Sequence, residues 1–561
     1  MIRSLLVFLT ILIGTTLSHA ENIFPNSSFD DFDGKRPKGW SIKSWNEEYT
    51  GTSYTPSTPG RDGSGTCFMV NESLDIADIE FTLPEIKVEP SSSYVFKGYY
   101  RANCKDIEII GEWLDSDKKS AGKFNMVLPE TQNSWCPFFE ELHVPANGNV
   151  LLIKIYRRHS GDIVCFDDFT LRKGTLRDYA AEFRPEFAEG SENVFPIFGW
   201  IPPGKYPHFK INIDLFDSDR ILAEYSTANF TLGGKNSVFG VKKLLPFSRT
   251  SDKDLLASEK DQDIWGYLGK DEPTEKLFPM IAGQKEKSKK LAPSKVFFNN
   301  LLPVYGFKSL DEYKDYLHKF VKEVKPEIIT YDFYPFPVRV PFFSHEFIPN
   351  MELVRSISKE AGAEYGIILQ VVAHGGLRST NEAELRWQAY LALAYGSKII
   401  GWFTFLTEKD YGKWIWNDAV IDRNGYRTRH YSMLRRINGE ILKLGKTLLD
   451  LESTGIYHSA PLPKRCMDIS KSPLVQSIDG KDLTIGEFIN AKAGGKKYFM
   501  IVNRDFTKEN QAVLSFKEKP KTIHEINKRN GNPEIFSGYD AASGFMKLPI
   551  SPGDGRLFSV E

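Results

Sequence analysis

The stretch IWGYLGKDEP, residues 264–273, joins an apolar, aromatic run to two acids and a proline. The run has the length and the aromatic content of a short buried strand. The residues after it have two interpretations. Asp271 can cap a helix that Pro273 helps to begin. Alternatively, Asp271 and Glu272 are paired carboxylates at a strand end, where they can lie in a pocket and move protons.

Seven more runs of this kind lie between about residues 190 and 407. They are VFPIFGW (194–200), NFTLGG (229–234), VKKLLP (241–246), KVFFNNLLP (295–303), EIITYDFYP (327–335), YGIILQVVAHG (365–375) and KIIGWFTFLT (398–407). Helical stretches separate most of them, and in residues 381–396 Leu385, Ala389 and Ala392 recur at helical spacing. Strands that alternate with helices in this way predict a (β/α)₈ barrel, a fold of about 250 residues, at residues 174–450.

The regions on both sides of the predicted barrel have β-patterns. Residues 21–173 contain short runs such as 93–100 and 163–171 with no useful helical period, and a β-sandwich is predicted there. Residues 451–561 return to β-runs such as 497–505, which predicts a second, C-terminal β-sandwich. Several domains are expected, because 561 residues are too many for one hydrophobic core.

The first 20 residues, MIRSLLVFLTILIGTTLSHA, have the pattern of a signal peptide, with Arg3 before an apolar run and small residues before the cleavage point. We therefore expect a secreted or periplasmic protein that begins near Glu21. No later stretch has the roughly 20 apolar residues of a membrane span. The 73 acidic and 72 basic residues almost cancel, so no strong field favours nucleic acid or an anionic membrane as a partner.

The cysteines and the short motifs bear on cofactors. Four of the five cysteines (Cys67, Cys104, Cys136 and Cys165) lie in the first third and allow three disulfide pairings, while buried free thiols are the alternative. No CxxC motif or His/Cys cluster suggests zinc. No GxGxxG or GxxxxGK[ST] motif opens a helix after a strand, so no redox or nucleotide cofactor is expected.

Polar and aromatic residues gather at the predicted strand ends, which form the active face of a (β/α)₈ barrel. The set is Trp200, Asp271, Glu272, Asn299, Asn300, Asp332, Tyr334, Gln370, His374, Trp402 and, just beyond the last strand, Glu408. Aromatic walls, amides and carboxylates at one opening are what a sugar site needs. We expect Trp200, Asp271, Asn300, Tyr334, Gln370, His374 and Trp402 to bind substrate. The two tryptophans could instead pack in the barrel core. Gln370 could instead bond to backbone groups, and His374 could cap a loop.

The barrel region resembles a known group of enzymes. WGYLGKDEP, FFNNLLPVY, TYDFYPF and ELRWQAYLALAYGSKIIGWFTF are similar to the barrel of glycoside hydrolases related to the β-galactosidase type, over roughly residues 190–460. The tail YFMIVNRD…GDGRLFSV resembles the β-sandwich that often follows. The resemblance implies that Glu272 is the general acid/base, and the neighbouring Asp271 could help to keep it protonated near neutral pH.

The sequence departs from that pattern on strand 7, where the resemblance implies a nucleophilic glutamate. Gln370 stands near the expected place, and an amide cannot be the nucleophile. Asp332 could instead activate a water at a carboxylate separation of about 6.5–9.5 Å, or Glu408 could be the nucleophile at about 5–5.5 Å. A third alternative is a barrel that binds sugar without cleaving it. We favour Asp332, because a strand end is held more rigidly than a loop.

The ends of the N-terminal region resemble the first and last strands of a jelly-roll carbohydrate-binding module, in NIFPNSSFDDFDGKRPKGW and CFDDFTLRKG. Such modules stack sugar rings on aromatic side chains. The candidates here are Trp40, Trp45, Tyr99, Tyr100, Trp113 and Trp135, most of which we expect in the core. Asp30 and Asp167 could share a structural calcium as in similar modules, although turn and surface roles are favoured.

Together these patterns predict an exported glycoside hydrolase that cleaves glycosidic bonds in a polysaccharide or oligosaccharide, β-linked if the resemblance holds. Glu272 and Asp332 are the expected catalytic pair. The alternative from another class is a non-catalytic glycan-binding protein with a degenerate barrel. An esterase is disfavoured because the chain has no GxSxG motif.

Overall fold

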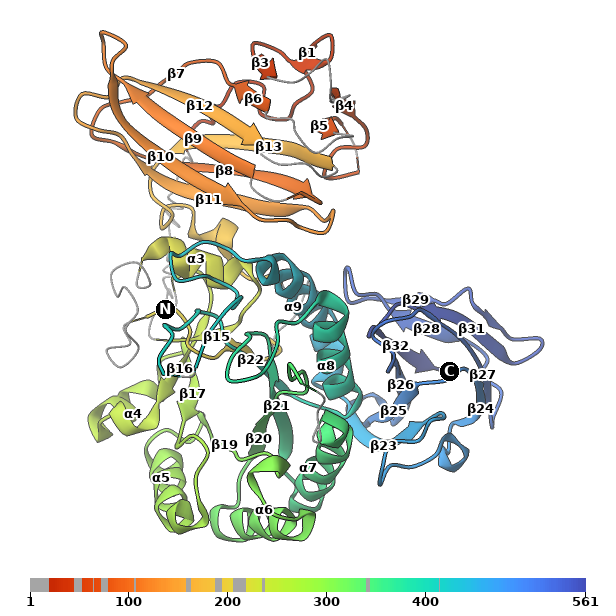
Figure 1. Cartoon of the computed structure of the whole chain (residues 1–561). Helices are drawn as coiled ribbons and strands as arrows, with labels where there is room; N and C mark the ends of the chain where they lie inside the picture. Colours follow the sequence, from red (N-terminus) through yellow and green to blue (C-terminus); the bar gives the residue numbers. More distant parts are fainter. Residues whose placement is uncertain are drawn as a thin grey trace, which may run out of the picture. The chain divides into compact units, whose positions relative to one another are not determined.

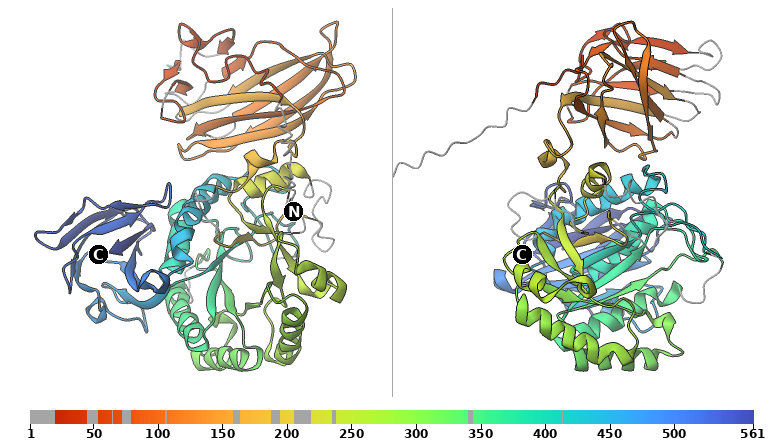
Figure 2. Two further views of the ribbon diagram at one scale, coloured as in Figure 1. Left: turned by 180° about the vertical axis from the view of Figure 1, so that it is seen from behind. Right: turned by 90° about the vertical axis from the view of Figure 1, so that its left-hand side faces the viewer.

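The structure is a computed structural model that describes residues 20–44, 53–63, 65–71, 79–104, 107–157, 163–186, 194–204, 218–234, 238–339, 344–412 and 414–561. The predicted leader, apart from Ala20, lies outside these ranges. The chain forms two compact units, Met1–Met126 with Trp135–Asp178, and Val127–Ser134 with Tyr179–Glu561. Each unit is described by itself below (Figures 1 and 2).

The N-terminal unit holds two antiparallel sheets that enclose a core of aromatic and aliphatic side chains. One has β10-β9-β12-β6-β3, with β7 also paired to β12, and the other has β11-β8-β13-β5-β4. The strands of the first are β3 (Ser41–Ser44), β6 (Ile79–Thr82), β7 (Ile86–Lys87), β9 (Ile107–Leu114), β10 (Ser120–Leu128) and β12 (Val150–Arg157). Those of the second are β4 (Ser53–Ser57), β5 (Cys67–Asn71), β8 (Ser93–Ala102), β11 (Cys136–His143) and β13 (Ile163–Lys173). A short ribbon, β1 (Phe32–Asp33) with β2 (Arg36–Pro37), precedes them.

The aromatic candidates of this unit divide into core and surface. Trp40, Tyr100 and Trp113 are buried in the core. Tyr99 and Trp135 are partly exposed, and each has a guanidinium group over its ring, 4.1 Å away for Tyr99 and 5.3 Å for Trp135. Trp45 lies outside the described residues.

The proposed calcium ligand Asp167 has a different use in this structure. Its two carboxylate oxygens accept hydrogen bonds from the backbone N–H groups of Arg61, at 2.8 Å, and Asp168, at 2.9 Å. Burial raises the pKa of Asp167 to about 6. Asp30 accepts a hydrogen bond from the backbone N–H of Thr66 at 3.2 Å. These backbone N–H donors make the two carboxylates acceptors in local turns.

The second unit contains a parallel sheet of nine strand segments in the order β18-β17-β16-β15-β14-β22-β21-β20-β19. Its first and last members, β18 and β19, are separated along the chain by Asn299 alone, so the sheet curves round into a barrel. The segments are β14 (Ile197–Gly199), β15 (Leu232–Gly233), β16 (Lys242–Pro246), β17 (Ile264–Leu268), β18 (Val296–Phe298), β19 (Asn300–Leu301), β20 (Ile328–Phe333), β21 (Glu364–Gln370) and β22 (Ile399–Phe403). Each predicted barrel run overlaps one of these strands, and the fifth run contains two.

Helices lie outside this sheet (Figure 1). They are α3 (Asp219–Thr227), α4 (Asp252–Ser258), α5 (Phe278–Leu291), α6 (Leu310–Val324), α7 (Phe347–Ala361), α8 (Glu382–Ala394) and α9 (Arg429–Leu448). Short 3-10 turns are η1 (Ala180–Phe183), η2 (Phe247–Arg249), η3 (Glu275–Leu277), η4 (Val304–Gly306) and η5 (Ser344–Glu346). Side-chain caps start several helices; for example, Asn381 and Glu384 form a capping box on α8. The predicted helical stretch at 381–396 contains α8.

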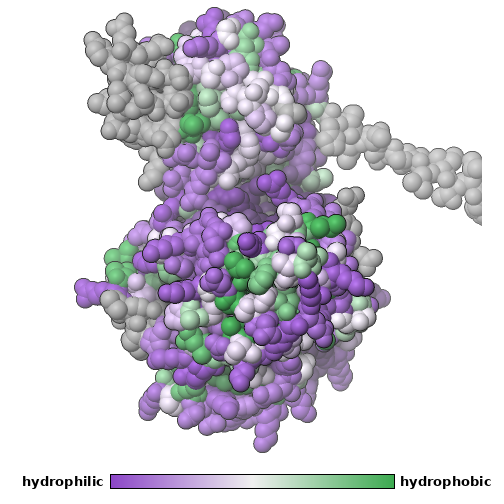
Figure 3. Space-filling view, turned by 90° about the vertical axis from the view of Figure 1, so that its right-hand side faces the viewer, coloured by the Kyte–Doolittle hydropathy of each residue, from purple (hydrophilic) through white to green (hydrophobic). Residues whose placement is uncertain are grey.

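The C-terminal region forms two antiparallel sheets around one apolar core. One sheet has the order β23-β25-β26-β32-β28-β29 and the other β24-β27-β31-β30. The strands are β23 (Glu452–His458), β24 (Val475–Asp479), β25 (Leu483–Asn490), β26 (Lys496–Asn503), β27 (Asn510–Phe516), β28 (Ile523–Ile526), β29 (Pro533–Ile535), β30 (Tyr539–Asp540), β31 (Phe545–Ile550) and β32 (Gly555–Val560), with η6 (Ile469–Lys471) and η7 (Ala491–Ala493). Hydrophobic and hydrophilic residues are interspersed on the face of the molecule in Figure 3.

This C-terminal sandwich packs closely on α8. A Cβ at Gly486 would lie 2.0 Å from the carbonyl oxygen of Ala394, so only glycine permits the approach. Arg386 on α8 forms ion pairs with Glu440 on α9, at 2.8 Å, and with Asp554 before β32, at 3.2 Å. The barrel and the C-terminal sandwich thereby share one compact unit.

Four of the five cysteines are buried in this structure, and Cys466 is partly buried. In the described residues, no helix combines the length and the apolar character needed to cross a membrane.

Candidate functional site

Asn300 joins two acids at the ends of neighbouring strands. Its side-chain N–H₂ group donates one hydrogen bond to Asp271, at 3.0 Å, and one to Asp332, at 2.9 Å. The backbone N–H of Glu272 donates to the Asn300 carbonyl at 2.8 Å. Asn300 and Asp332 are only 3% and 4% exposed. The ends of strands β17, β19 and β20 therefore hold three carboxyl groups around one buried amide, the arrangement that defines the candidate site.

Glu272 and Asp332 interact directly through a side-chain hydrogen bond. Two carboxyl groups can share such a bond only if one carries a proton. Burial, together with the charge of Glu272, raises the pKa of Asp332 to about 8. Burial and the charge of Asp271 raise the pKa of Glu272. The pair therefore keeps one proton at neutral pH, which we describe as a property of the pair and not of either residue.

The sequence predicted a wide gap between these two carboxyl groups, and this expectation is wrong. Carboxyl groups in hydrogen-bonding contact are closer than the separations of about 5–5.5 Å or 6.5–9.5 Å associated with the two standard glycosidase geometries. The physical reason is that β19 brings Asn300 between the strand ends and draws Asp332 toward the loop after β17.

Asp271 and Glu272 are the solvent-facing members of the cluster, since both residues are exposed. Burial of its carboxyl group nevertheless raises the pKa of Asp271, while the hydrogen bond from Asn300 lowers it. Glu272 has a left-handed backbone with φ of 42°, a region that non-glycine residues seldom adopt. Strained residues of this type often occur at functional sites, where surrounding contacts hold them.

The helix-cap interpretation of Asp271 is not what the structure shows. The 3-10 turn η3 has Thr274 as its N-cap, without a side-chain cap bond, and α5 follows with Leu277 as its N-cap. The carboxylate of Asp271 instead accepts the hydrogen bond from Asn300.

Two tyrosines stand close to the carboxyl groups. Tyr334 follows Asp332 by two residues, and burial with the charge of Asp332 raises its pKa well above the usual value. Tyr305, in η4 after β19, is 38% exposed, and its pKa is raised by desolvation and by the charges of Asp332 and Glu272. Both hydroxyls therefore stay protonated and can donate hydrogen bonds. Tyr305 was absent from the predicted site, although it ends the motif FFNNLLPVY.

An aromatic column leads from Tyr334 into the loop after β22. The ring of Tyr334 is 5.6 Å from that of His374, which stacks on Trp416 at 4.7 Å with an interplanar angle of 8°. Trp414 stacks beside His374 at 6.2 Å. Burial lowers the pKa of His374 to about 4, so its imidazole is neutral at physiological pH. His374 thus belongs to a stack of aromatic rings, and as a neutral imidazole it fits ring contacts better than proton transfer.

Gln370 does not take part in this cluster. It is fully buried, and its side-chain oxygen accepts a hydrogen bond from the N–H of Phe336 at 3.0 Å. Its side-chain nitrogen donates to the carbonyl of Arg378 at 2.8 Å. Because these bonds use the amide to fasten the loops after β20 and β21, the prediction that Gln370 binds substrate is corrected to a structural role.

The two predicted tryptophan platforms also differ from expectation. Trp402 is fully buried, and its indole N–H donates to Asn438 on α9 at 2.9 Å. It therefore packs between the sheet and the helices and cannot stack on a sugar. Trp200 is partly buried and packs against the apolar cluster inside the barrel, 6.4 Å from the ring of Phe198.

Glu408 is separate from the carboxyl pair in its electrostatics. It is 7% exposed, and burial alone raises its pKa to about 7, with no contribution from another charged group. A carboxylate about 5 Å from Glu272 or Asp332 would feel their charges strongly. The structure thus supports Asp332 over Glu408 as the partner of Glu272.

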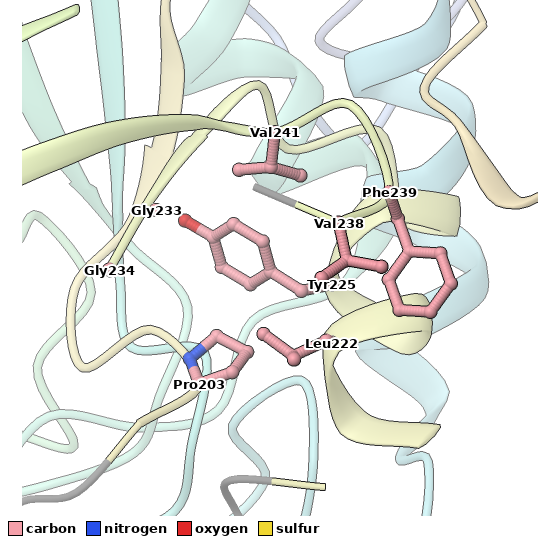
Figure 4. A pocket seen from close by; sticks show the side chains of 8 residues that line it. All are labelled: Pro203, Leu222, Tyr225, Gly233, Gly234, Val238, Phe239 and Val241. Carbon is pink, nitrogen blue, oxygen red and sulfur yellow. The ribbon is translucent and has the colours of Figure 1, made fainter. Parts of the chain in front are cut away.

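No group of three or more His, Cys, Asp or Glu side chains in the described residues has the arrangement of a metal site. The acids of the cluster face the Asn300 amide and each other, which suits proton exchange. A small apolar cavity of about 10 Å³ lies elsewhere, beside Tyr225 and Phe239, and holds at most one water (Figure 4). A wider hollow of about 360 Å³ lies between β16 and α4 and includes Lys243, Arg249 and Asp261. Neither includes a carboxyl of the cluster.

No family model and no curated protein sequence matches this chain. One similar solved structure is a family 39 glycoside hydrolase from the gut symbiont Bacteroides cellulosilyticus WH2. The two chains are 11% identical, and the match covers 83% of this chain and 97% of that chain, with a TM-score of 0.36. Another is the CBM22-1–GH10 part of Clostridium thermocellum endo-1,4-beta-D-xylanase 10B with xylohexaose, with 10% identity, coverages of 75% and 97%, and a TM-score of 0.28.

The carbohydrate-binding module TmCBM61, in complex with beta-1,4-galactotriose, is similar to a shorter part of the chain. It shares 17% identity, covers 28% of this chain and 100% of its own, and has a TM-score of 0.20. These neighbours are glycoside hydrolases and a carbohydrate-binding module. Likenesses of this size do not assign an activity, so the function has to be argued from the residues of the site.

Proposed function

We propose that the barrel hydrolyses glycosidic bonds, because this is the most direct use of a carboxyl pair that keeps one proton at neutral pH beside aromatic side chains. The observation that carries the proposal is the Glu272–Asp332 hydrogen bond next to the Asn300 bridge. A general acid works best when its pKa lies near the operating pH, and this pair meets that condition.

The proposed roles follow from exposure. Glu272 is the exposed member of the pair and faces the substrate, while Asp332 is buried and stores the proton. The proton moves to the glycosidic oxygen as its bond to the anomeric carbon breaks, and the electron pair of that bond stays on the oxygen. Water adds to the anomeric carbon and returns a proton to the vacated carboxylate pair. The net reaction consumes one water for each bond cleaved.

Asn300 positions the proton in this scheme. Its two N–H bonds stabilise the ionised forms of Asp271 and Asp332 and lower the pKa of each. The side-chain oxygen of Asn300 is buried and has no hydrogen-bond partner. Tyr305 and Tyr334 supply hydroxyl donors, and His374 with Trp414 supplies ring faces. This combination suits the hydroxyl groups and the apolar ring faces of a sugar.

The wider proposal is an exported enzyme that acts on a polysaccharide or oligosaccharide, with β-linked sugars as the first to test. The signal-peptide pattern supports export, and the N-terminal sandwich supports a sugar-binding role through its partly exposed Tyr99 and Trp135. Export, the type of glycan and the sugar-binding role of the N-terminal sandwich are each proposed from sequence pattern and residue chemistry.

A glycan-binding protein without catalysis is the second candidate. The observation in its favour is Gln370, whose amide is built into the loop framework where the resemblance implies a nucleophile. In that case the carboxyl cluster would bind sugar hydroxyl groups and transfer no proton.

Release of reducing ends separates the two candidates. Wild type, Glu272→Gln and Asp332→Asn are incubated with soluble β-glucans, xylans, galactans and mannans, and binding is measured in parallel. Hydrolysis predicts release by wild type and a loss of about 10²–10⁴-fold in each variant. Tight binding with no release by wild type, unchanged in the variants, would reject the hydrolase and support the binding protein.

A further inference from the structure

Two buried cysteines meet on neighbouring strands of the N-terminal sandwich. Cys67 begins β5 and Cys165 lies in β13, and these two strands pair antiparallel (Figure 1). Cys165 stands opposite Met69, which is two residues after Cys67. The two cysteines are therefore diagonal neighbours on one face of the sheet, where long side chains can reach each other. A side-chain hydrogen bond joins the two thiols, and both residues are fully buried.

The face that the two thiols share points away from the space between the two sheets. Phe68 follows Cys67, and its ring lies 5.1 Å from that of Phe81 on β6 of the opposite sheet. Because side chains alternate along a strand, Cys67 points the other way. Phe166 follows Cys165 and stands opposite Phe68, so it shares the direction of Phe68. The thiol pair is therefore held on the outer side of the sheet.

The other two cysteines of this unit are placed differently. Cys136 lies on β11, which is separated from β5 by β8 and β13 and from β13 by β8. At about 4.8 Å per strand, Cys136 is roughly 14 Å from β5 and 10 Å from β13, beyond the reach of a disulfide. Cys104 lies past the end of β8, three residues after the residue opposite Cys165. Among the three cysteines that the described strands carry, only Cys67 and Cys165 are neighbours.

A cation lies beside the thiol pair. Arg101 on β8 stands directly opposite Cys165 and bonds to its sulfur, and its guanidinium lies 5.3 Å from the centre of the Trp135 ring. Hydrogen bonds from Cys67 and Arg101 lower the pKa of Cys165 to about 7, although burial opposes them. The bond to Cys165, together with burial, raises the pKa of Cys67. Cys165 is therefore partly a thiolate at neutral pH, the form that attacks a disulfide.

We propose that Cys67 and Cys165 form a reversible disulfide that cross-links β5 to β13, and that Arg101 keeps this bond easy to reduce. The inference is separate from the proposed hydrolysis. The oxidant is a small external disulfide such as that of glutathione. The Cys165 thiolate attacks one of its sulfurs and releases a thiolate. Cys67 then loses its proton, attacks the Cys165 sulfur and releases the second thiolate, so one disulfide is exchanged for another.

Two effects of opposite sign decide how easily this bond forms. The cross-link closes a long loop of chain between residues 67 and 165, which favours the disulfide because it restricts the unfolded chain. The Arg101 guanidinium stabilises the thiolate of the reduced pair, which favours the two thiols. Both sulfurs are buried, so an external disulfide reaches them only before the sandwich has folded or when it opens locally. Oxidation should therefore be faster during refolding than in the folded protein.

The test identifies the cross-link in the full chain. The protein is reduced, unfolded and refolded in glutathione buffers of graded composition, and the reaction is quenched with acid. The remaining thiols are alkylated, and unreduced proteolytic peptides are analysed by mass spectrometry. We expect a peptide pair joined through Cys67 and Cys165. Joining of either residue to a different cysteine, or alkylation of both in the most oxidising buffer, overturns the proposal.

Serine variants and hydrogen exchange control this result. Cys67→Ser and Cys165→Ser should each remove the joined peptides, and Cys466→Ser, in the C-terminal region, is the matched variant that should leave them. Amides of β5 and β13 should exchange more slowly in the cross-linked protein than in the reduced protein. Faster exchange would mean that the bond forms only by distorting the sheet, which contradicts the geometry proposed for it.

Arg101→Gln tests the second half of the proposal. Without the guanidinium, the reduced pair loses the stabilisation of its thiolate. Half-oxidation should then require a ratio of oxidised to squared reduced glutathione that is about tenfold lower than in wild type. Arg101→Lys keeps the positive charge and should return this ratio most of the way to the wild-type value. Thermal unfolding checks that each variant is folded, and an unchanged ratio in Arg101→Gln overturns the role given to Arg101.

Discussion

The ends of β17, β19 and β20 differ from the ends of β21 and β22 in what their polar residues do. On the first three strands, the Asn300 amide donates hydrogen bonds to Asp271 and Asp332. On the last two, Gln370 and Trp402 are fully buried and bond to the surrounding framework. Asn300 and Gln370 are both amides near strand ends, so neither residue type nor position along the strand separates these two. The direction of the side chain separates a chemical role from a structural one.

The largest expected effect comes from exchanging roles between these regions. Gln370→Glu places a carboxylate where the resemblance implies a nucleophile, yet the oxygen that replaces the amide nitrogen would face the carbonyls of Phe336 and Arg378. We expect a loss of at least about 3 kcal/mol in the free energy of unfolding and no gain in hydrolysis. Chemical denaturation and reducing-end assays measure the two quantities.

The matched change on the other side is Glu272→Gln, which should abolish hydrolysis with little loss of stability. A stable, more active Gln370→Glu protein would remove the distinction between the two regions.

The second prediction concerns the pH dependence of stability. The pKa of Asp332 is about 8 in the folded protein, above its unfolded value of about 3.9, so the folded state binds the extra proton between these values. Stability contributed by this group is therefore present at low pH and is lost as pH rises from about 4 to 8, by at most about 1.4 kcal/mol per pH unit. Asp332→Asn should flatten this slope in urea unfolding at a series of pH values. An unchanged slope would show that the pair does not hold the proton.

A smaller effect is expected from the amide that bridges the acids. Asn300→Ala removes the hydrogen bonds that lower the pKa values of Asp271 and Asp332, so both should rise. We expect hydrolysis to fall by about 10- to 100-fold and the alkaline limb of its pH profile to move upward.

Asn299→Ala is the neighbouring control, because the Asn299 side chain donates to the backbone carbonyl of Lys270 and not to a carboxyl group. It should lower stability without moving the pH profile. If both variants move the profile equally, Asn300 has no special role in placing the proton.

The smallest effect is expected at Glu408, which stands outside both groups. Burial raises its pKa to about 7, so ionising it lowers stability above neutral pH. In Glu408→Gln, the loss of unfolding free energy between pH 5 and pH 8 should be smaller than in wild type. The rate of hydrolysis should change by no more than about threefold. A loss as large as that of Glu272→Gln would instead make Glu408 a catalytic residue.

Much of the fold was predictable because a hydrophobic run indicates a buried strand even when the strands beside it in the sheet are unknown. Each predicted barrel run overlaps a strand, including the fifth, which Asn299 divides into β18 and β19. The sequence predicted Glu272 and Asp332 as the catalytic pair, and this stays a prediction; the structure shows that their side chains interact. Their contact distance was not predictable, because it depends on how Asn300 draws three strand ends inward.

The prediction that Trp402 binds substrate was wrong for a different physical reason. Trp402 and Phe403 are adjacent, and their side chains point to opposite faces of β22, but a buried parallel strand is apolar on both faces. Its sequence therefore does not reveal which residue points inward. Trp414 and Trp416 lie beyond the strand in WIW, where their position relative to a strand end gives no signal.

The backbone at residue 272 has a consequence for engineering. A glutamate with φ of 42° adopts a conformation that costs roughly 1 kcal/mol more for it than for glycine. Glu272→Gly should therefore raise the melting temperature while it removes the proposed acid. Selection of variants for heat resistance alone would then drive this position toward inactivity, so a thermostability screen of this protein needs a concurrent activity threshold.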